Sequence, residues 1–149
     1  MGFSNDYEVL VLAHLLRNED IGNLGDAAGL VASATEGDVW LALHTASPGE
    51  AGTQATNEAS YGGYSRISIQ RRYTRWNVVG TALSNVDLVQ WPTCTSGSSL
   101  VTHFSIGVEN GSTGWGNVMI CYGQLPSVLS VSTGVQPQFA PGSLVITLD

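Results

Sequence analysis

The sequence predicts an all-β protein: a single domain over residues 1–149, built as an antiparallel β-sandwich or jelly roll of about eight strands with one N-terminal helix and a long extended loop. Three observations predict this fold. Apolar and polar residues alternate with a period of two from residue 38 onward, and turn-forming residues separate the alternating runs. No helical segment lies between the runs, so the crossovers that parallel strands need have no candidate.

The predicted helix covers residues 5–17, NDYEVLVLAHLLR. Asn5 is a suitable N-cap, and Arg17 is placed to interact favourably with the C-terminal end of the helix dipole. Because the helix is apolar nearly all round, we expect cover on more than one side, within its own domain or at a subunit interface. The Gly- and Ala-rich residues 21–37 form a connector, and the β body follows over 38–149.

Strands are predicted wherever the side chains alternate. Three apolar residues share one face of the run DVWLALHT, and two isoleucines share one face of YSRISIQ. Turn dipeptides such as Asn110-Gly111 separate the later runs. Those later runs lie at residues 73–79, 82–91, 100–108, 117–125, 128–132 and 143–148.

A long connection joins two of the predicted strands. Residues 45–63, TASPGEAGTQATNEASYGG, contain nineteen mostly small or polar residues. Loops of this length without secondary structure are uncommon in compact domains and are usually functional or disordered. We therefore expect either a passive flexible loop or an extended arm that becomes ordered against a partner.

Charge is sparse and mostly negative. Twelve carboxylates accompany five arginines and no lysine, which gives a net charge of -7. Nucleic acid and anionic membranes are bound through clusters of cations, so neither is an expected partner. The sequence has no apolar run long enough to span a membrane and no secretion signal at its start, and Cys94 and Cys121 are expected to be reduced thiols.

The sequence lacks the motifs of the common enzyme classes. Without lysine, the chain has no lysine nucleophile, no Schiff base and no P-loop cation. His14, His44 and His103 do not show the short spacing that metal ligands usually have. We therefore predict no enzyme activity, no cofactor and no metal site.

One glycan-acting or lectin-like alternative stays open. Glu50, Glu58 and Asp87 could form a carboxylate pair of the glycosidase kind. Solvated loop acids are nevertheless far commoner than catalytic ones. The aromatic residues that could contact a sugar are Trp40, Trp76, Trp91 and Trp115.

Four of the five arginines lie within ten residues of one another, at positions 66, 71, 72 and 75, and we call them the arginine band. Arginine beside Tyr and Trp is enriched at protein interfaces. The alternative is that these arginines neutralise the chain's own carboxylates. Under the interface hypothesis, changing Arg71 and Arg72 to Glu weakens assembly and leaves the fold intact. With parts of the helix and the long loop, the predicted partner interface comprises Arg66, Arg71, Arg72, Tyr73, Arg75, Trp76, Pro48, Glu50, Glu58, Tyr61, Leu12 and Leu16.

Four stretches are distinctive: FSNDYEVLVLAHLL, DVWLALHTASPGEAGTQATNEASYGGYSRISI, VTHFSIG and GVQPQFAPGSLVITLD. Through them nearly the whole chain resembles a family of small virion proteins of tailed bacteriophages. Members are commonly labelled tail-fibre proteins, and some resemble capsid cement or decoration proteins. The chain departs from the family pattern at Ser47-Pro48, where an acid is expected before the proline, and in its arginine-rich RRYTRW segment.

The resemblance implies a jelly-roll-like domain that forms a homotrimer on the capsid exterior and binds the major capsid protein, without a cofactor or catalytic residue. The expected function is that of a capsid cement or decoration protein that stabilises the assembled phage head, made in the host bacterial cytoplasm. The alternative is a structural or adhesion protein of the tail fibre or baseplate. Hundreds of copies per particle indicate the shell, and a handful indicate the tail.

Overall fold

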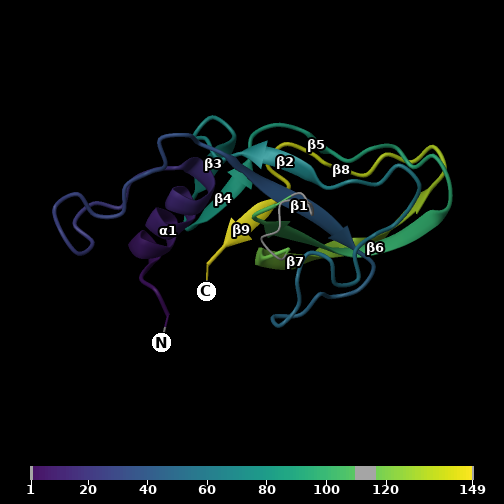
Figure 1. Ribbon diagram of the computed structural model, residues 1–149, viewed down its shortest axis with the longest axis horizontal. Helices are drawn as coiled ribbons and strands as arrows, with labels where there is room; N and C mark the ends of the chain where they lie inside the picture. The colour runs from purple at the N-terminus through teal and green to yellow at the C-terminus, as the bar shows by residue number, and fades with distance from the viewer. Residues whose placement is uncertain (1, 110–116, 149) are drawn as a thin grey trace. The chain divides into compact units, whose positions relative to one another are not determined.

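The computed structural model describes residues 2–109 and 117–148 (Figure 1). Within these residues the chain is mostly β, with sheets of strand order β2-β1-β6-β7, β3-β4-β9 and β5-β8, so the all-β prediction is confirmed. The predicted turn at Asn110-Gly111 lies outside the described residues. The elements are α1 (Asn5–Arg17), β1 (Asp38–His44), β2 (Ile67–Gln70), β3 (Trp76–Val79), β4 (Ala82–Asn85), β5 (Val89–Gln90), β6 (Ser98–Gly107), β7 (Met119–Ser132), β8 (Gln138–Phe139) and β9 (Val145–Thr147).

The chain divides into two compact units, each assembled from separate stretches of sequence. A single domain over residues 1–149 stays a prediction. No described helix is long and apolar enough to cross a membrane. Unit 1 comprises Met1–Asp38, Gln70–Val89 and Phe139–Asp149, and unit 2 comprises Val39–Ile69 and Gln90–Gln138.

Unit 1 packs α1 on β3 and β4 of the three-stranded sheet. Leu12 and Leu16 on the helix are buried, as are Leu83 and Ile146, which pair across β4 and β9. Unit 1 itself therefore buries the face of the helix that carries Leu12 and Leu16. Leu10 on the same helix stays exposed.

The ends of α1 follow from local sequence. The N-cap is Ser4 in extended conformation, one residue before the predicted cap Asn5, and its side chain makes no capping hydrogen bond. At the other end Asn18 adopts the left-handed conformation, with φ of 56°, and its N–H donates to the carbonyl of Ala13. Asparagine tolerates this conformation better than most residues, which explains why the helix stops here.

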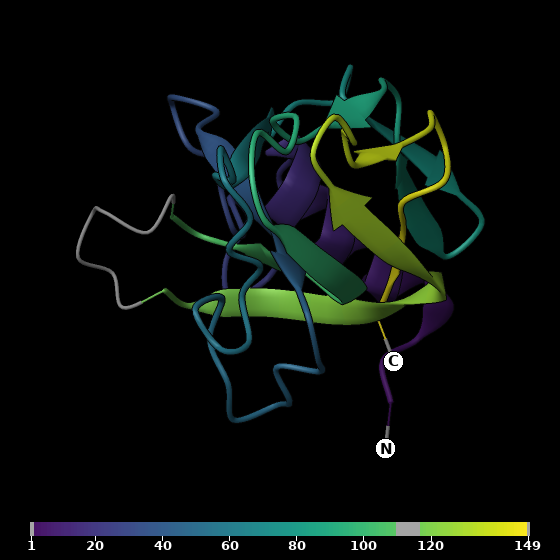
Figure 2. The same ribbon diagram turned by 90° about the vertical axis from the view of Figure 1, so that its right-hand side faces the viewer.

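Unit 2 is built on the four-stranded sheet. Leu41 of β1 faces Ile106 of β6 in the antiparallel register, and both side chains are fully buried. The predicted runs at 117–125 and 128–132 are one strand, β7, whose register against β6 shifts between them. Pro126 lies within the shift and has no N–H to donate to a sheet, which favours a bulge at this point. Figure 2 shows β7, in yellow-green, bending between its two halves.

Residues 45–63 form a long loop between β1 and β2, and hydrogen bonds tie it to its own unit. The N–H of Thr45 donates to the carbonyl of Asn57 at 2.8 Å, and the N–H of Ala59 donates to the carbonyl of Leu43 at 2.8 Å. These bonds return the loop alongside the end of β1. Part of the backbone of this loop is thereby hydrogen-bonded within the chain.

Candidate functional site

The loop and the four-stranded sheet meet at a bidentate ion pair. Nε and Nη2 of Arg66 donate to Oε1 and Oε2 of Glu58, each at 2.8 Å, with side chains 5% and 19% exposed. Oε1 also accepts a hydrogen bond of 2.9 Å from the Tyr64 hydroxyl, which itself accepts one from the N–H of Leu43. The hydrogen bonds that Arg66 donates to Glu58 raise the pKa of Arg66, and burial raises the pKa of Tyr64. The geometry is the planar fork in which Arg binds a carboxylate most strongly.

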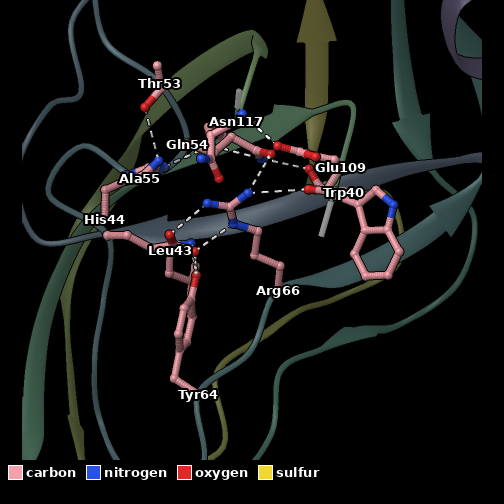
Figure 3. Close-up of polar contacts among 12 residues, drawn as sticks. Trp40, Leu43, His44, Thr53, Gln54, Ala55, Tyr64, Arg66, Glu109 and Asn117 are labelled. Carbon is pink, nitrogen blue, oxygen red and sulfur yellow. Dashed lines mark hydrogen bonds and ion pairs between the residues drawn. The ribbon is translucent and has the colours of Figure 1, made fainter. Parts of the chain in front are cut away.

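Gln54 extends this network across the sheet, as Figure 3 shows. Its Nε2 donates to the carbonyl of Trp40 at 2.8 Å and to Oγ of Ser105 at 3.3 Å. Its Oε1 accepts a hydrogen bond of 3.4 Å from Nη1 of Arg66. The amide fits because position 107 is glycine: a Cβ there would collide with the side-chain amide of Gln54. A fully buried glutamine is thus satisfied by three partners.

Beneath the loop, His44 and Ser105 form a hydrogen-bonded pair. His44 Nε2 lies 2.7 Å from Ser105 Oγ, and Nδ1 lies 2.8 Å from the carbonyl of Thr56. A carbonyl can only accept, so Nδ1 carries the proton; burial, the largest cause, lowers the pKa of His44 and favours this neutral form. The Ser105 hydroxyl then donates to Nε2. This resembles a nucleophile and its base, yet both side chains are fully buried and no substrate can reach them.

Glu109 and Asn117 lie at the neighbouring ends of β6 and β7. Oε1 of the buried Glu109 accepts a hydrogen bond of 2.6 Å from the N–H of Asn117, and its carbonyl accepts one of 3.3 Å from Nη1 of Arg66. The carbonyl of Asn117 accepts one of 3.0 Å from the N–H of Gln54. The loop, β1, β6 and β7 are therefore joined by one polar network within unit 2.

The surface above this network is a shallow, open depression of about 630 Å³. Glu58 and Arg66 form part of its lining, but their charged atoms bind each other. Glu58 is therefore engaged by an arginine, as is Asp87 by Arg75, and neither is arranged as half of a carboxylate pair. The remaining lining residues are Ala55, Ala59, Ser60, Tyr61, Tyr64, Ser65 and Asn117.

Each member of the arginine band binds acceptors of its own chain. Arg71 donates to the last carbonyls of α1, from Nε to Leu15 at 2.6 Å and from Nη2 to His14 at 2.8 Å. Arg72 pairs with Glu36 at 3.0 Å, and Arg75 pairs with Asp87. These contacts support the alternative of internal neutralisation. They also correct the expectation that Arg71→Glu leaves the fold intact, because Arg71 satisfies the C-terminal end of a helix.

A comparison with models of known protein families identifies the family of the chain. The model of the family described as Podophage GP4 fiber I protein gp80 matches residues 2–147. The chain belongs to this family. Comparison with curated proteins finds no match. As a member of a podophage fiber family, the chain is a phage structural protein, and membership favours a non-enzymatic role in the virion; the resemblance to phage virion proteins is confirmed at this level.

The interface predicted for this fiber-family protein is only partly at its surface. Arg72, Tyr73, Arg75 and Glu50 are exposed, and Arg71 and Glu58 are half-buried. The other six residues of the predicted interface are buried. Arg66 is buried with its ion pair, and the other five have largely apolar side chains. The buried members are Pro48, Tyr61, Arg66, Trp76, Leu12 and Leu16.

Two of the four tryptophans named for the glycan-acting alternative lie in the core of this fiber-family protein, and Trp40 is half-buried. Trp76 and Trp91 are core residues, which removes them as sugar-stacking surfaces, and Trp115 lies outside the described residues. Among residues 2–109 and 117–148, no three His, Cys, Asp or Glu side chains gather closely enough to hold a metal ion. Cys94 and Cys121 are free thiols, and burial raises the pKa of Cys121 to about 11.

Proposed function

We propose that the chain is a structural subunit of the phage tail fibre, which acts by binding other virion proteins and catalyses no reaction. The observation that carries this proposal is the family match over residues 2–147, because the family description names a fiber protein. This favours the tail over the capsid surface that the sequence resemblance suggested. We further propose that the protein works as a homotrimer.

The polar network of unit 2 supports a structural role. Its charged and polar atoms bind one another, and the histidine and serine that could act as base and nucleophile are closed to solvent. A fully satisfied buried network holds a loop in one conformation. Rigid loops suit a subunit that must present the same surface in every copy.

Copy number and location in the virion test the proposal. Quantitative mass spectrometry of purified particles, with the major capsid protein as the internal standard, is expected to give a small number of copies per virion. Gold-labelled antibody viewed by electron microscopy is expected to mark the tail. Hundreds of copies spread over the head would overturn the fibre assignment and favour a decoration protein bound to the major capsid protein.

A further inference from the structure

Three fully buried side chains of unit 2 carry groups that can react with one another. Ser105 of β6 has a hydroxyl, His44 of β1 has an imidazole, and Gln54 of the loop has a carboxamide. Ser105 Oγ lies 2.7 Å from Nε2 of His44 and 3.3 Å from Nε2 of Gln54. No external substrate can reach the serine and the histidine, but a carboxamide of the same chain is already beside them.

His44 is held in the form that can take a proton from Ser105. Its Nδ1 donates to the carbonyl of Thr56 at 2.8 Å, so the lone pair of Nε2 is available to the Ser105 hydroxyl. A serine hydroxyl is a weak nucleophile until an adjacent base accepts its proton. The histidine therefore occupies the position of the base, and its backbone contact keeps the ring in the required tautomer.

The Gln54 carboxamide is oriented by two further contacts. Its Nε2 donates to the carbonyl of Trp40 at 2.8 Å, and its Oε1 accepts a hydrogen bond of 3.4 Å from Nη1 of Arg66 (Figure 3). A carbonyl can only accept and a guanidinium can only donate, so these contacts fix which end of the carboxamide is the oxygen. Arg66 thus places a positive charge beside Oε1, where negative charge would develop if a nucleophile attacked Cδ.

We propose that Ser105 and Gln54 form an intramolecular ester bond, with His44 as the base. Oγ of Ser105 attacks Cδ of Gln54, which is one bond away from the Nε2 atom that Oγ contacts, and the hydroxyl proton passes to Nε2 of His44. The tetrahedral intermediate carries its negative charge on Oε1, beside Arg66. It then expels the Gln54 nitrogen as ammonia, which takes the proton back from His44. A C–O bond replaces a C–N bond, and the reaction needs no oxidant, reductant or cofactor.

The ester joins the loop 45–63 to β6 by a covalent bond. A cross-link between residues distant in sequence stabilises a fold mainly by restricting the unfolded chain. Cys94 and Cys121 are free thiols and supply no such cross-link. The reaction occurs once in each chain and acts on no other molecule, so it goes beyond the structural role proposed above and does not depend on where the protein lies in the virion.

Tryptic digestion of the purified full chain tests the proposal. Trypsin cuts after arginine and lysine, and the chain has five arginines and no lysine, so Gln54 falls in the peptide 18–66 and Ser105 in the peptide 76–149. After denaturation and digestion at neutral pH, mass spectrometry is expected to find these two peptides linked, with their summed mass reduced by one molecule of ammonia. Fragmentation should place the link at Gln54 and Ser105. Two separate peptides, with Gln54 intact or converted to Glu, would overturn the proposal and leave the tail-fibre assignment untouched.

Variants assign the roles of the side chains, with circular dichroism to check that each one folds. Ser105→Ala removes the nucleophile and is expected to abolish the linked peptide. Ser99→Ala, which removes another buried hydroxyl of β6, is the matched control and should keep it. In chain made by cell-free translation and sampled over time, His44→Asn should slow formation of the link by about a hundredfold or more. A link that forms in Ser105→Ala, or at the wild-type rate in His44→Asn, would contradict these roles.

Discussion

Arg66, the residue that precedes β2, forms two hydrogen bonds with Glu58, each 2.8 Å long. These bonds hold the end of the loop 45–63 against the start of β2. Arg66 is buried, so the loss of its partner leaves a charge that the surrounding protein stabilises poorly. A lysine cannot reproduce two parallel hydrogen bonds from a planar fork. The stability of unit 2 therefore depends on the shape of this side chain as well as on its charge.

Arg66→Lys is expected to lower the free energy of unfolding by about 3 kcal/mol, the cost of disturbing a buried pair. Urea unfolding followed by tryptophan fluorescence measures it. The control is Arg75→Lys, which alters an ion pair whose side chains are both about half exposed, and which should cost about 1 kcal/mol or less. Equal effects of the two substitutions would contradict the structural role of the Glu58 pair.

Gly107→Ala is expected to destabilise the protein by about 2–3 kcal/mol, because the added methyl group meets the Gln54 side chain and lies 2.6 Å from the carbonyl of Val118. Gly22→Ala is the matched control, since a Cβ at that position meets no atom within 4 Å. Thermal unfolding of both variants measures the difference. Equal melting temperatures would mean that the loop does not lie against β6 as described.

Arg71→Glu is expected to lower the free energy of unfolding by about 2 kcal/mol, because it removes donors from the carbonyl end of α1 and places a negative charge there. Arg72→Glu, at the neighbouring exposed position, should cost about 1 kcal/mol or less. Thermal unfolding monitored by helical circular dichroism distinguishes them. If Arg71→Glu were as stable as wild type, the contacts to His14 and Leu15 would have no energetic role.

Stability is expected to fall as the pH drops below about 6.5, the ordinary pKa of histidine. Burial holds the pKa of His44 lower in the folded chain, with contributions from Glu58, which raises it, and from Arg66 and His103, which lower it. Below pH 6.5 the unfolded chain therefore binds more protons at this site, and protonation favours unfolding until the pH passes the folded pKa. Above pH 6.5 this site adds no pH dependence.

The variant His44→Asn tests this prediction, because asparagine can still donate to the carbonyl of Thr56 and does not titrate. Urea midpoints at pH 7.5 and pH 5.5 are compared for each protein. Wild type should lose more stability between the two values than the variant. The same loss in both would assign the acid sensitivity to other groups.

Local patterns predicted the regular elements well. The helix at 5–17 was found with its bounds unchanged, since its apolar residues are unbroken by glycine or proline. Pro126 made one strand resemble two, because sequence patterns do not distinguish a bulge from a turn. The two-residue strand β8 has too few residues to show an alternation.

The polar network could not be predicted in the same way. Gln54 lies in a stretch of small polar residues that is typical of a solvated loop, and its partners Trp40, Arg66 and Ser105 come from three other segments. No spacing rule connects them. Gly107, at the end of the alternating run VTHFSIG, was the one local sign that another group approaches β6 closely.

Unit 1 is assembled from three separate stretches of sequence, and this affects how it folds while the chain is being synthesised. As the chain leaves the ribosome, α1 and β4 emerge long before β9, which pairs with β4 through Leu83 and Ile146. The stretches of unit 2 end at Gln138, so they are complete before β9 is translated. Contacts between residues so distant in sequence form slowly. The sheet of unit 1 is therefore incomplete until β9 has emerged, and until then the edge of β4 that pairs with β9 is open to misassembly.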